Sequence, residues 1–90
     1  MNYVFKVSPA WTDSYKSLTT EQKRMARAAF KTFKANPFDP SLRPHPIHSL
    51  SVAYRRTIYS VSISGKLRSV FYVSGNVVRS VDIGTHDIYG

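Results

Sequence analysis

Three segments of alternating apolar and polar residues, separated by two glycine-marked turns, constrain the fold of this chain more than any other feature. Residues 59–63, 67–73 and 77–83 hold most of its Val and Ile, and residues 64–66 and 74–76 lie between them. Glycine with a small polar neighbour between two alternating runs is typical of a β-hairpin turn. The stretch therefore predicts a three-stranded antiparallel meander.

The length of the first turn decides which face of the meander carries Arg68. A two-residue turn at 65–66 places Arg68 opposite Ile63, whereas a three-residue turn at 64–66 places it opposite Ser62. A shift of one residue exchanges the two faces of a strand, and burying a lone arginine in an apolar core is costly. We therefore expect Arg68 on the open, serine-bearing face of the sheet.

The first part of the chain predicts one strand followed by two helices. Residues 2–7 alternate as a strand does, and Ser8 before Pro9 is typical of a helix start. Thr19 and Gln22 have the spacing of a capping box at the start of a second helix. The whole 90-residue chain therefore predicts a single α+β domain, with two N-terminal helices packed on a small, twisted, mainly antiparallel four-stranded sheet.

The segment before the meander predicts a loop. Residues 36–50 contain four of the five prolines of the chain, together with His45 and His48. Proline at this density disfavours both helix and central strand. For residues 53–56 the sequence leaves two alternatives open, the end of this loop or the start of the sheet.

The charge of the chain limits the kind of partner it suits. Thirteen Lys and Arg against five Asp and Glu give a net charge of +8. A small domain with this balance suits nucleic acid, an anionic membrane surface or an acidic protein segment, and the alternative is a basic surface that serves solubility alone. On the second predicted helix we expect a solvated basic face, formed by Lys23, Arg27, Lys31 and Lys34.

The composition also argues against several classes of site. The chain has no cysteine, and its three histidines and five acids show no metal-ligand spacing. It has no glycine-rich phosphate loop and no apolar run that approaches the length of a membrane span. We expect a soluble, cytoplasmic protein with no metal, no other cofactor and no membrane partner.

The order of the predicted elements, together with several short motifs, resembles the RelE/ParE superfamily of toxins from type II toxin–antitoxin systems. Four stretches carry the likeness: residues 48–50, 59–63, 66–73 and 81–89. Many members of that superfamily cleave mRNA, commonly in the ribosomal A site, and another branch poisons DNA gyrase without cutting nucleic acid. Where the family pattern has two lysines in the first meander strand, this chain has Ser60 and Ser62, and its tail is one residue shorter before the final aromatic residue.

The resemblance implies three catalytic residues. The ribonuclease branch has an arginine in the second meander strand, matched by Arg68, and an arginine or histidine two residues after the last-strand glycine, matched by His86. Tyr89 matches the aromatic residue that follows. Histidine suits acid–base chemistry because its unperturbed pKa is about 6.5, and arginine suits a charged phosphate transition state. The alternatives are a surface histidine, a solvated strand arginine and a tyrosine that fills the core.

A fourth catalytic candidate and four candidates for RNA binding complete the expected site. His48 is the second acid–base candidate, with a purely structural loop role as the alternative, and His45 is a weaker one. Tyr59 and Tyr72 are expected to pack. The candidates for RNA binding, with ordinary surface charge as the alternative, are Arg55, Arg56, Lys66 and Arg79.

The resemblance therefore implies a toxin that acts as a metal-independent, ribosome-dependent endoribonuclease, cleaving mRNA and inhibiting translation. Its expected partners are mRNA, the ribosome and a cognate acidic antitoxin, with no small-molecule cofactor. One alternative is a non-enzymatic DNA gyrase inhibitor of the ParE kind, whose toxicity would survive His86→Ala. The other is a catalytically inactive RNA-binding relative, which Ser60 and Ser62 suggest.

Overall fold

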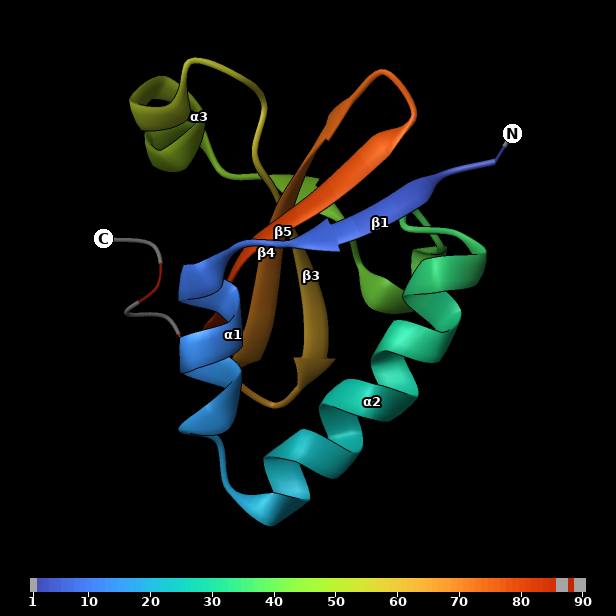
Figure 1. Ribbon diagram of the computed structural model, residues 1–90, viewed down its shortest axis with the longest axis vertical. Coiled ribbons are helices and arrows are strands. Elements are labelled where there is room, and N and C mark those ends of the chain that lie inside the picture. Colours follow the sequence, from blue (N-terminus) through green and yellow to red (C-terminus); the bar gives the residue numbers. More distant parts are fainter. Residues whose placement is uncertain (1, 86–87, 89–90) are drawn as a thin grey trace.

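The computed structural model describes residues 2–85 and 88 and has the predicted α+β fold (Figure 1). The strands are β1 (Val4–Val7), β2 (His45–Pro46), β3 (Tyr59–Ser64), β4 (Leu67–Ser74) and β5 (Val77–Gly84). The helices are α1 (Pro9–Lys16), α2 (Thr20–Ala35) and α3 (His48–Tyr54), with a short 3-10 helix, η1 (Pro40–Leu42).

The strand order of the sheet, in the part of the chain that the structure describes, is β1-β5-β4-β3-β2. β3, β4 and β5 form the predicted antiparallel meander, and β1 joins β5 in parallel. The predicted count of four strands is wrong by one, because β2 pairs His45 with Ser60 and Pro46 with Tyr59 at the far edge. Two residues are too few to show alternation, and proline lacks a ladder donor, so no local pattern indicates this strand.

Both predicted helix starts are confirmed. Ser8 caps α1, and its hydroxyl accepts a hydrogen bond from the Trp11 amide at 3.1 Å. The predicted capping box is present at α2: the Gln22 amide donates to the Thr19 hydroxyl at 3.1 Å, and the Thr19 amide donates to the Gln22 side chain at 3.0 Å. These bonds satisfy amides that the helix itself leaves unpaired, which fixes where each helix begins.

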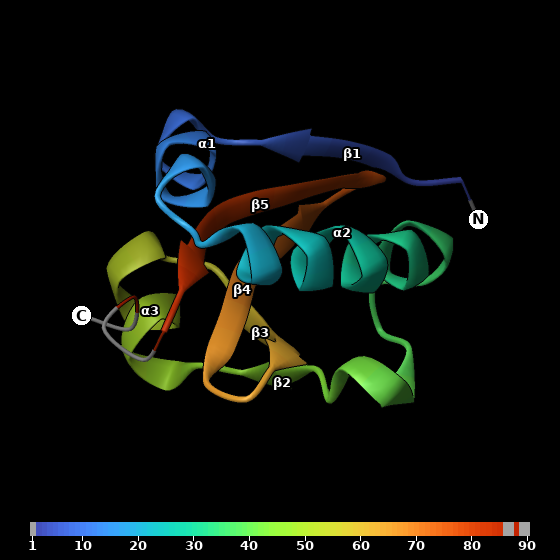
Figure 2. The same ribbon diagram turned by 90° about the horizontal axis from the view of Figure 1, so that it is seen from below.

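α1 and α2 pack on one face of the sheet, and Figure 2 shows α2 running across the strands. Phe33 of α2 and Phe71 of β4 are both buried, with ring centroids 4.9 Å apart. A second cluster joins Ala26 of α2 to Leu67 and Ile83 of the meander. Because side chains alternate along a strand, the neighbours of these residues point to the opposite face of the sheet.

That opposite face, called the open face below, carries Arg68, Val70 and Tyr72 of β4 and is partly covered by α3. Leu50 of α3 packs against a small cluster that contains Val70 and Val81. α3 corrects the prediction that the loop extends to residue 50. Residues 53 and 54 end this helix and residues 55–56 form the turn after it, so the alternative in which 53–56 begin the sheet is wrong.

Tertiary contacts, rather than a local start signal, stabilise α3. No side chain caps its first turn, and it ends at Arg55 in the left-handed conformation with φ 57°. The Ser51 hydroxyl donates to the Ile47 carbonyl at 2.8 Å and accepts from the Ile58 amide at 2.9 Å, which joins the helix to the residue that directly precedes β3. A seven-residue helix of this kind leaves little trace in sequence periodicity.

Candidate nucleic-acid interface

Arg68 is the second residue of β4, the central strand of the sheet, and lies directly opposite Ser62 of β3 and Gly84 of β5. The pairing with Ser62 confirms the expected face of Arg68, but the expected three-residue turn is wrong. Ser64 pairs with Leu67 across a two-residue turn at 65–66, and a shift in register between Ser62 and Ser64 brings Arg68 opposite Ser62. It puts Arg68 on the open face, on the side away from α1 and α2. Gly84 precedes His86 by two residues in the chain, so the sheet brings Arg68 beside the start of the C-terminal segment.

The guanidinium group of Arg68 bonds to backbone carbonyls. Its Nη1 donates to the Gly65 carbonyl at 2.5 Å and to the Leu67 carbonyl at 3.1 Å. Among the described residues the one ion pair is that of Arg24 with Glu21, so no described carboxylate neutralises Arg68. The carbonyl groups are neutral, so the positive charge of the half-buried Arg68 side chain is available to pair with an anion.

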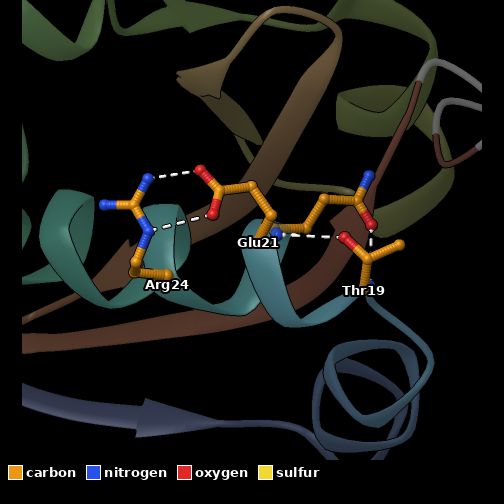
Figure 3. A network of polar contacts seen from close by, with 4 residues as sticks. Thr19, Glu21 and Arg24 are labelled. Atoms are coloured by element: carbon orange, nitrogen blue, oxygen red, sulfur yellow. Dashed lines mark hydrogen bonds and ion pairs between the residues drawn. The ribbon is translucent and has the colours of Figure 1, made fainter.

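The Arg24–Glu21 pair lies at the start of α2, beside Thr19 (Figure 3). Arg24 Nε donates to Glu21 Oε2 at 3.0 Å, and a second bond joins Arg24 Nη2 to Glu21 Oε1. The hydrogen bond from Arg24 lowers the pKa of the Glu21 carboxyl below its ordinary value. Both side chains are exposed, so this network stabilises the helix start only slightly and forms no part of the open face.

His86 and Tyr89 lie outside the described residues, so their predicted roles stay predictions. The described residues beside them are anchored. The Ile88 amide donates to the Thr85 carbonyl at 3.1 Å, and the Ile88 side chain packs against the cluster of Val70 and Val81 on the open face. The described residues on either side of His86 are therefore held, Gly84 by its pairing with Arg68 in the sheet and Ile88 by packing on the open face.

A second group of charged and aromatic side chains occupies the open face at Tyr72. The guanidinium carbon of Arg56 lies 4.3 Å from the centroid of the Tyr72 ring, within cation–π range. Arg79 is the cross-strand partner of Tyr72 and shares its face. The structure thus brings together two predicted RNA-binding residues, Arg56 and Arg79. It also adds Tyr72, for which the sequence predicted packing alone.

The remaining predicted residues lie around these two groups rather than with them. His48 is the exposed first residue of α3, Arg55 is exposed at its end, and Lys66 is exposed in the turn beside Arg68. His45 is exposed on β2, with its Nδ1 3.0 Å from the Arg43 carbonyl oxygen. Across the described residues, no cluster of three or more His, Asp or Glu side chains could hold a metal ion.

An apolar groove lies on the other side of the molecule, between α1, α2 and β1. This cavity of about 640 Å³ has aromatic walls that include Phe5, Trp11 and Phe30. Its basic lining is formed by Lys6, Arg27, Lys31 and Lys34. Three of these cations belong to the α2 face for which we expected simple solvation.

No helix in the described part of the chain is both long enough and apolar enough to cross a membrane.

Comparison with solved structures identifies the fold. Archaeal RelE, in a RelE–RelB complex from Pyrococcus horikoshii OT3, superposes with a TM-score of 0.71 at 13% identity, covering 94% of this chain and 96% of that chain. YoeB from Staphylococcus aureus gives a TM-score of 0.68 at 21% identity, covering 96% and 99%. YafQ from the E. coli DinJ–YafQ toxin–antitoxin complex gives 0.70 at 13% identity, covering 98% and 97%.

No protein-family model matches the chain, and no curated protein matches its sequence. The likeness to solved structures is therefore one of fold at low identity, but it extends over nearly the whole of both chains. The chain has the RelE-like fold that RelE, YoeB and YafQ share.

Proposed function

We propose that this protein is the toxin of a type II toxin–antitoxin system and a metal-independent endoribonuclease that cleaves mRNA on the ribosome. The observation that carries the proposal is Arg68, an arginine of the central strand that lies on the open face directly opposite Gly84, without a described carboxylate partner. The RelE-like fold supports the same reading, since solved neighbours with this fold occur in toxin–antitoxin complexes.

The chemistry needs an acid–base group and a cation beside one phosphodiester. In the proposed reaction a base takes the proton of the 2′-OH, and the 2′ oxygen attacks the adjacent phosphorus. The bond to the 5′ oxygen breaks, and that oxygen receives a proton, leaving a 2′,3′-cyclic phosphate and a 5′-OH. His86 is the proposed acid–base residue, with His48 as the second candidate. Arg68 stabilises the charge on the phosphorane-like transition state, and Tyr89 orients the RNA.

Basic residues around the open face supply the electrostatic attraction for RNA. Arg56 and Arg79 adjoin Tyr72 of β4. Lys66 lies in the turn before Arg68, and Arg55 directly precedes Arg56. Each phosphate that such a cation neutralises releases bound counterions, so affinity should fall steeply as the salt concentration rises.

The apolar groove between α1, α2 and β1 supports a second part of the proposal, an acidic antitoxin. Aromatic walls with a basic lining suit an amphipathic segment that carries Asp and Glu beside its apolar side chains. β1 is an edge strand whose outer side is unpaired within the described sheet, so an extended segment could also add to it.

The test is inhibition of translation combined with mapping of mRNA ends in cells that express the wild type, Arg68→Ala or His86→Ala. We expect new 5′ ends with the wild type and a loss of at least about 100-fold with either variant. Arg24→Ala is the matched control, since it also removes one arginine but lies at the start of α2. Toxicity that persists unchanged in His86→Ala without mRNA cleavage would overturn the ribonuclease and favour gyrase inhibition.

A second candidate function is RNA binding without cleavage. The observation that favours it is Ser60, which is 0% exposed and occupies a position where the resemblance would have a lysine. This candidate predicts tight, salt-sensitive binding of RNA that stays intact on purified ribosomes. The appearance of cleavage products in the same assay would exclude it.

A further inference from the structure

The Arg56–Tyr72 stack has the geometry of a recognition site rather than that of a buried packing contact. Arg56 is exposed and its guanidinium carbon lies 4.3 Å from the Tyr72 ring centroid, so the two groups are in direct contact. Tyr72 is half-buried because it also packs against the cluster of Ile58, Val70 and Val81, which are at most 6% exposed. The tyrosine ring is therefore supported by the protein core, while the arginine faces solvent.

The backbone beneath Arg56 is also held. The Arg56 amide donates to the Ser51 carbonyl at 3.2 Å, directly after the left-handed residue Arg55 that ends α3. The Ser51 hydroxyl accepts from the Ile58 amide two residues further on, at 2.9 Å. These hydrogen bonds, at Arg56 itself and two residues after it, restrict the turn that presents its side chain, so little order has to be gained when a ligand binds.

The surroundings of the stack favour an anionic ligand with flat groups. Within the described residues no carboxylate pairs with Arg56, and a second cation, Arg79, lies across from Tyr72 on β5. Arg68 lies on the same face of β4, four residues away, or about 13 Å along the strand. One face of one strand thus carries a stacking surface and, further along, the cation of the proposed cleavage site.

We propose that Arg56 and Tyr72 form a base-stacking subsite for single-stranded RNA, with Arg79 binding the phosphate beside the stacked base. This inference rests on the proposed function, which makes RNA the ligand of the open face. Unpaired bases stack on aromatic rings and on guanidinium planes, largely irrespective of sequence. The subsite therefore fixes the position of the RNA chain relative to Arg68 and adds affinity without selecting a base.

The experiment compares two probes that differ only in their bases: a short unstructured oligoribonucleotide, and the same length of backbone with abasic sites. Binding of each is measured by fluorescence anisotropy at several salt concentrations. For the wild type we expect tighter binding of the probe with bases. Tyr72→Leu should weaken that probe by about 5- to 150-fold, the range for loss of one stacked base, and leave the abasic probe unchanged.

Arg56→Lys tests the guanidinium plane while keeping the charge. It should weaken the probe with bases and leave the abasic probe unchanged, whereas Arg79→Gln should weaken both. Tyr72→Phe keeps the ring and should bind both probes as the wild type does. Arg56 is exposed, so Arg56→Lys should fold normally. It therefore tests the subsite even if Tyr72→Leu folds poorly.

Equal binding of the two probes by the wild type would overturn the subsite. An unchanged preference for bases in Arg56→Lys and Tyr72→Leu would overturn it as well. The proposed ribonuclease fails differently: the wild type would show the base preference and the variant effects while leaving mRNA uncut on ribosomes. The binding assay therefore tests the stacking subsite, and the cleavage assay separately tests the proposed ribonuclease.

Discussion

Replacing Gly84 by alanine is expected to displace the C-terminal segment without unfolding the protein. A Cβ atom at position 84 would lie 2.7 Å from Cγ2 of Ile88, closer than real contacts allow. Positive φ values among the described glycines occur at Gly65 and Gly75, so the backbone at Gly84 does not itself require glycine. The space taken by Ile88 is therefore what excludes a side chain at Gly84.

Two opposing effects set the change in the free energy of unfolding. Full burial of an isoleucine contributes about 1.5–3 kcal/mol, so losing the contacts of the half-buried Ile88 should cost about 1 kcal/mol. Alanine in place of a strand glycine raises the free energy of unfolding by about 0.5–1 kcal/mol, because the unfolded chain has less conformational freedom. The two effects nearly cancel, and the Tm of Gly84→Ala should stay within about 4 °C of the wild type.

A double-mutant cycle read by thermal unfolding isolates the contact. Ile88→Ala alone should lower the Tm by roughly 4–8 °C, since it removes the same packing without any gain at position 84. In the Ile88→Ala background the clash is gone, so Gly84→Ala should now stabilise the protein by about 0.5–1 kcal/mol. Both single variants should also reduce mRNA cleavage, by up to about 100-fold, if the segment between residues 84 and 88 positions His86.

Additivity would refute this reasoning. If Gly84→Ala changes the free energy of unfolding equally with and without the isoleucine side chain at position 88, contact with Ile88 does not limit the side chain at Gly84. If both single variants cleave mRNA at the wild-type rate, the anchoring of Ile88 has no part in positioning the proposed catalytic residue.

Three further predictions concern single residues. Arg68→Lys keeps the charge but loses the two-pronged donor geometry, so mRNA cleavage should fall at least about 10-fold while Tm is nearly unchanged, measured by end mapping and thermal unfolding. Ser60→Lys places an ammonium group at a position that is 0% exposed, and thermal unfolding should show a loss of about 3 kcal/mol or more. The Ser41 hydroxyl and amide lower the pKa of Asp39, so its stabilising contribution is present at neutral pH and lost as the pH falls through that lowered pKa, below the ordinary value of about 3.9. The difference in unfolding free energy between the wild type and Asp39→Asn, measured by urea titration, should accordingly vanish in strong acid.

Features that depend on neighbouring residues were predictable from the sequence. The capping box of Thr19 and Gln22 is local, and so are the glycine turns of the meander. The face of Arg68 was predictable for a different reason, because the other face would bury a lone arginine in an apolar core. The turn length was not predictable in this way, since a shift in register between Ser62 and Ser64 allows a two-residue turn to keep Arg68 opposite Ser62.

Features that depend on distant contacts were not predictable in this way. α3 has no capping side chain and is stabilised by Ser51, whose hydroxyl bonds to Ile58 seven residues away. The stack of Arg56 on Tyr72 joins a turn to a strand sixteen positions later, and no periodicity relates them. Tyr72 alternates correctly for a strand residue, so packing was the natural prediction, and only the register of β4 with β5 places Arg79 beside it.

The burial of Ser60 explains why the cations of the open face come from other elements. Ser60 lies between His45 of β2 and Val70 of β4 and is 0% exposed, so a lysine there would have to place its ammonium in a site closed to water. Two positions bordering the same face can carry charge without that cost: Arg56, exposed on the turn after α3, and Arg79, half-buried on β5. Both positions adjoin Tyr72. The ring and the guanidinium group of Arg56 that lies over it together form a flat, charged surface. Such a surface suits the flat base as well as the phosphate of a nucleotide, so serines in β3 leave the positive charge of the open face to these neighbouring positions.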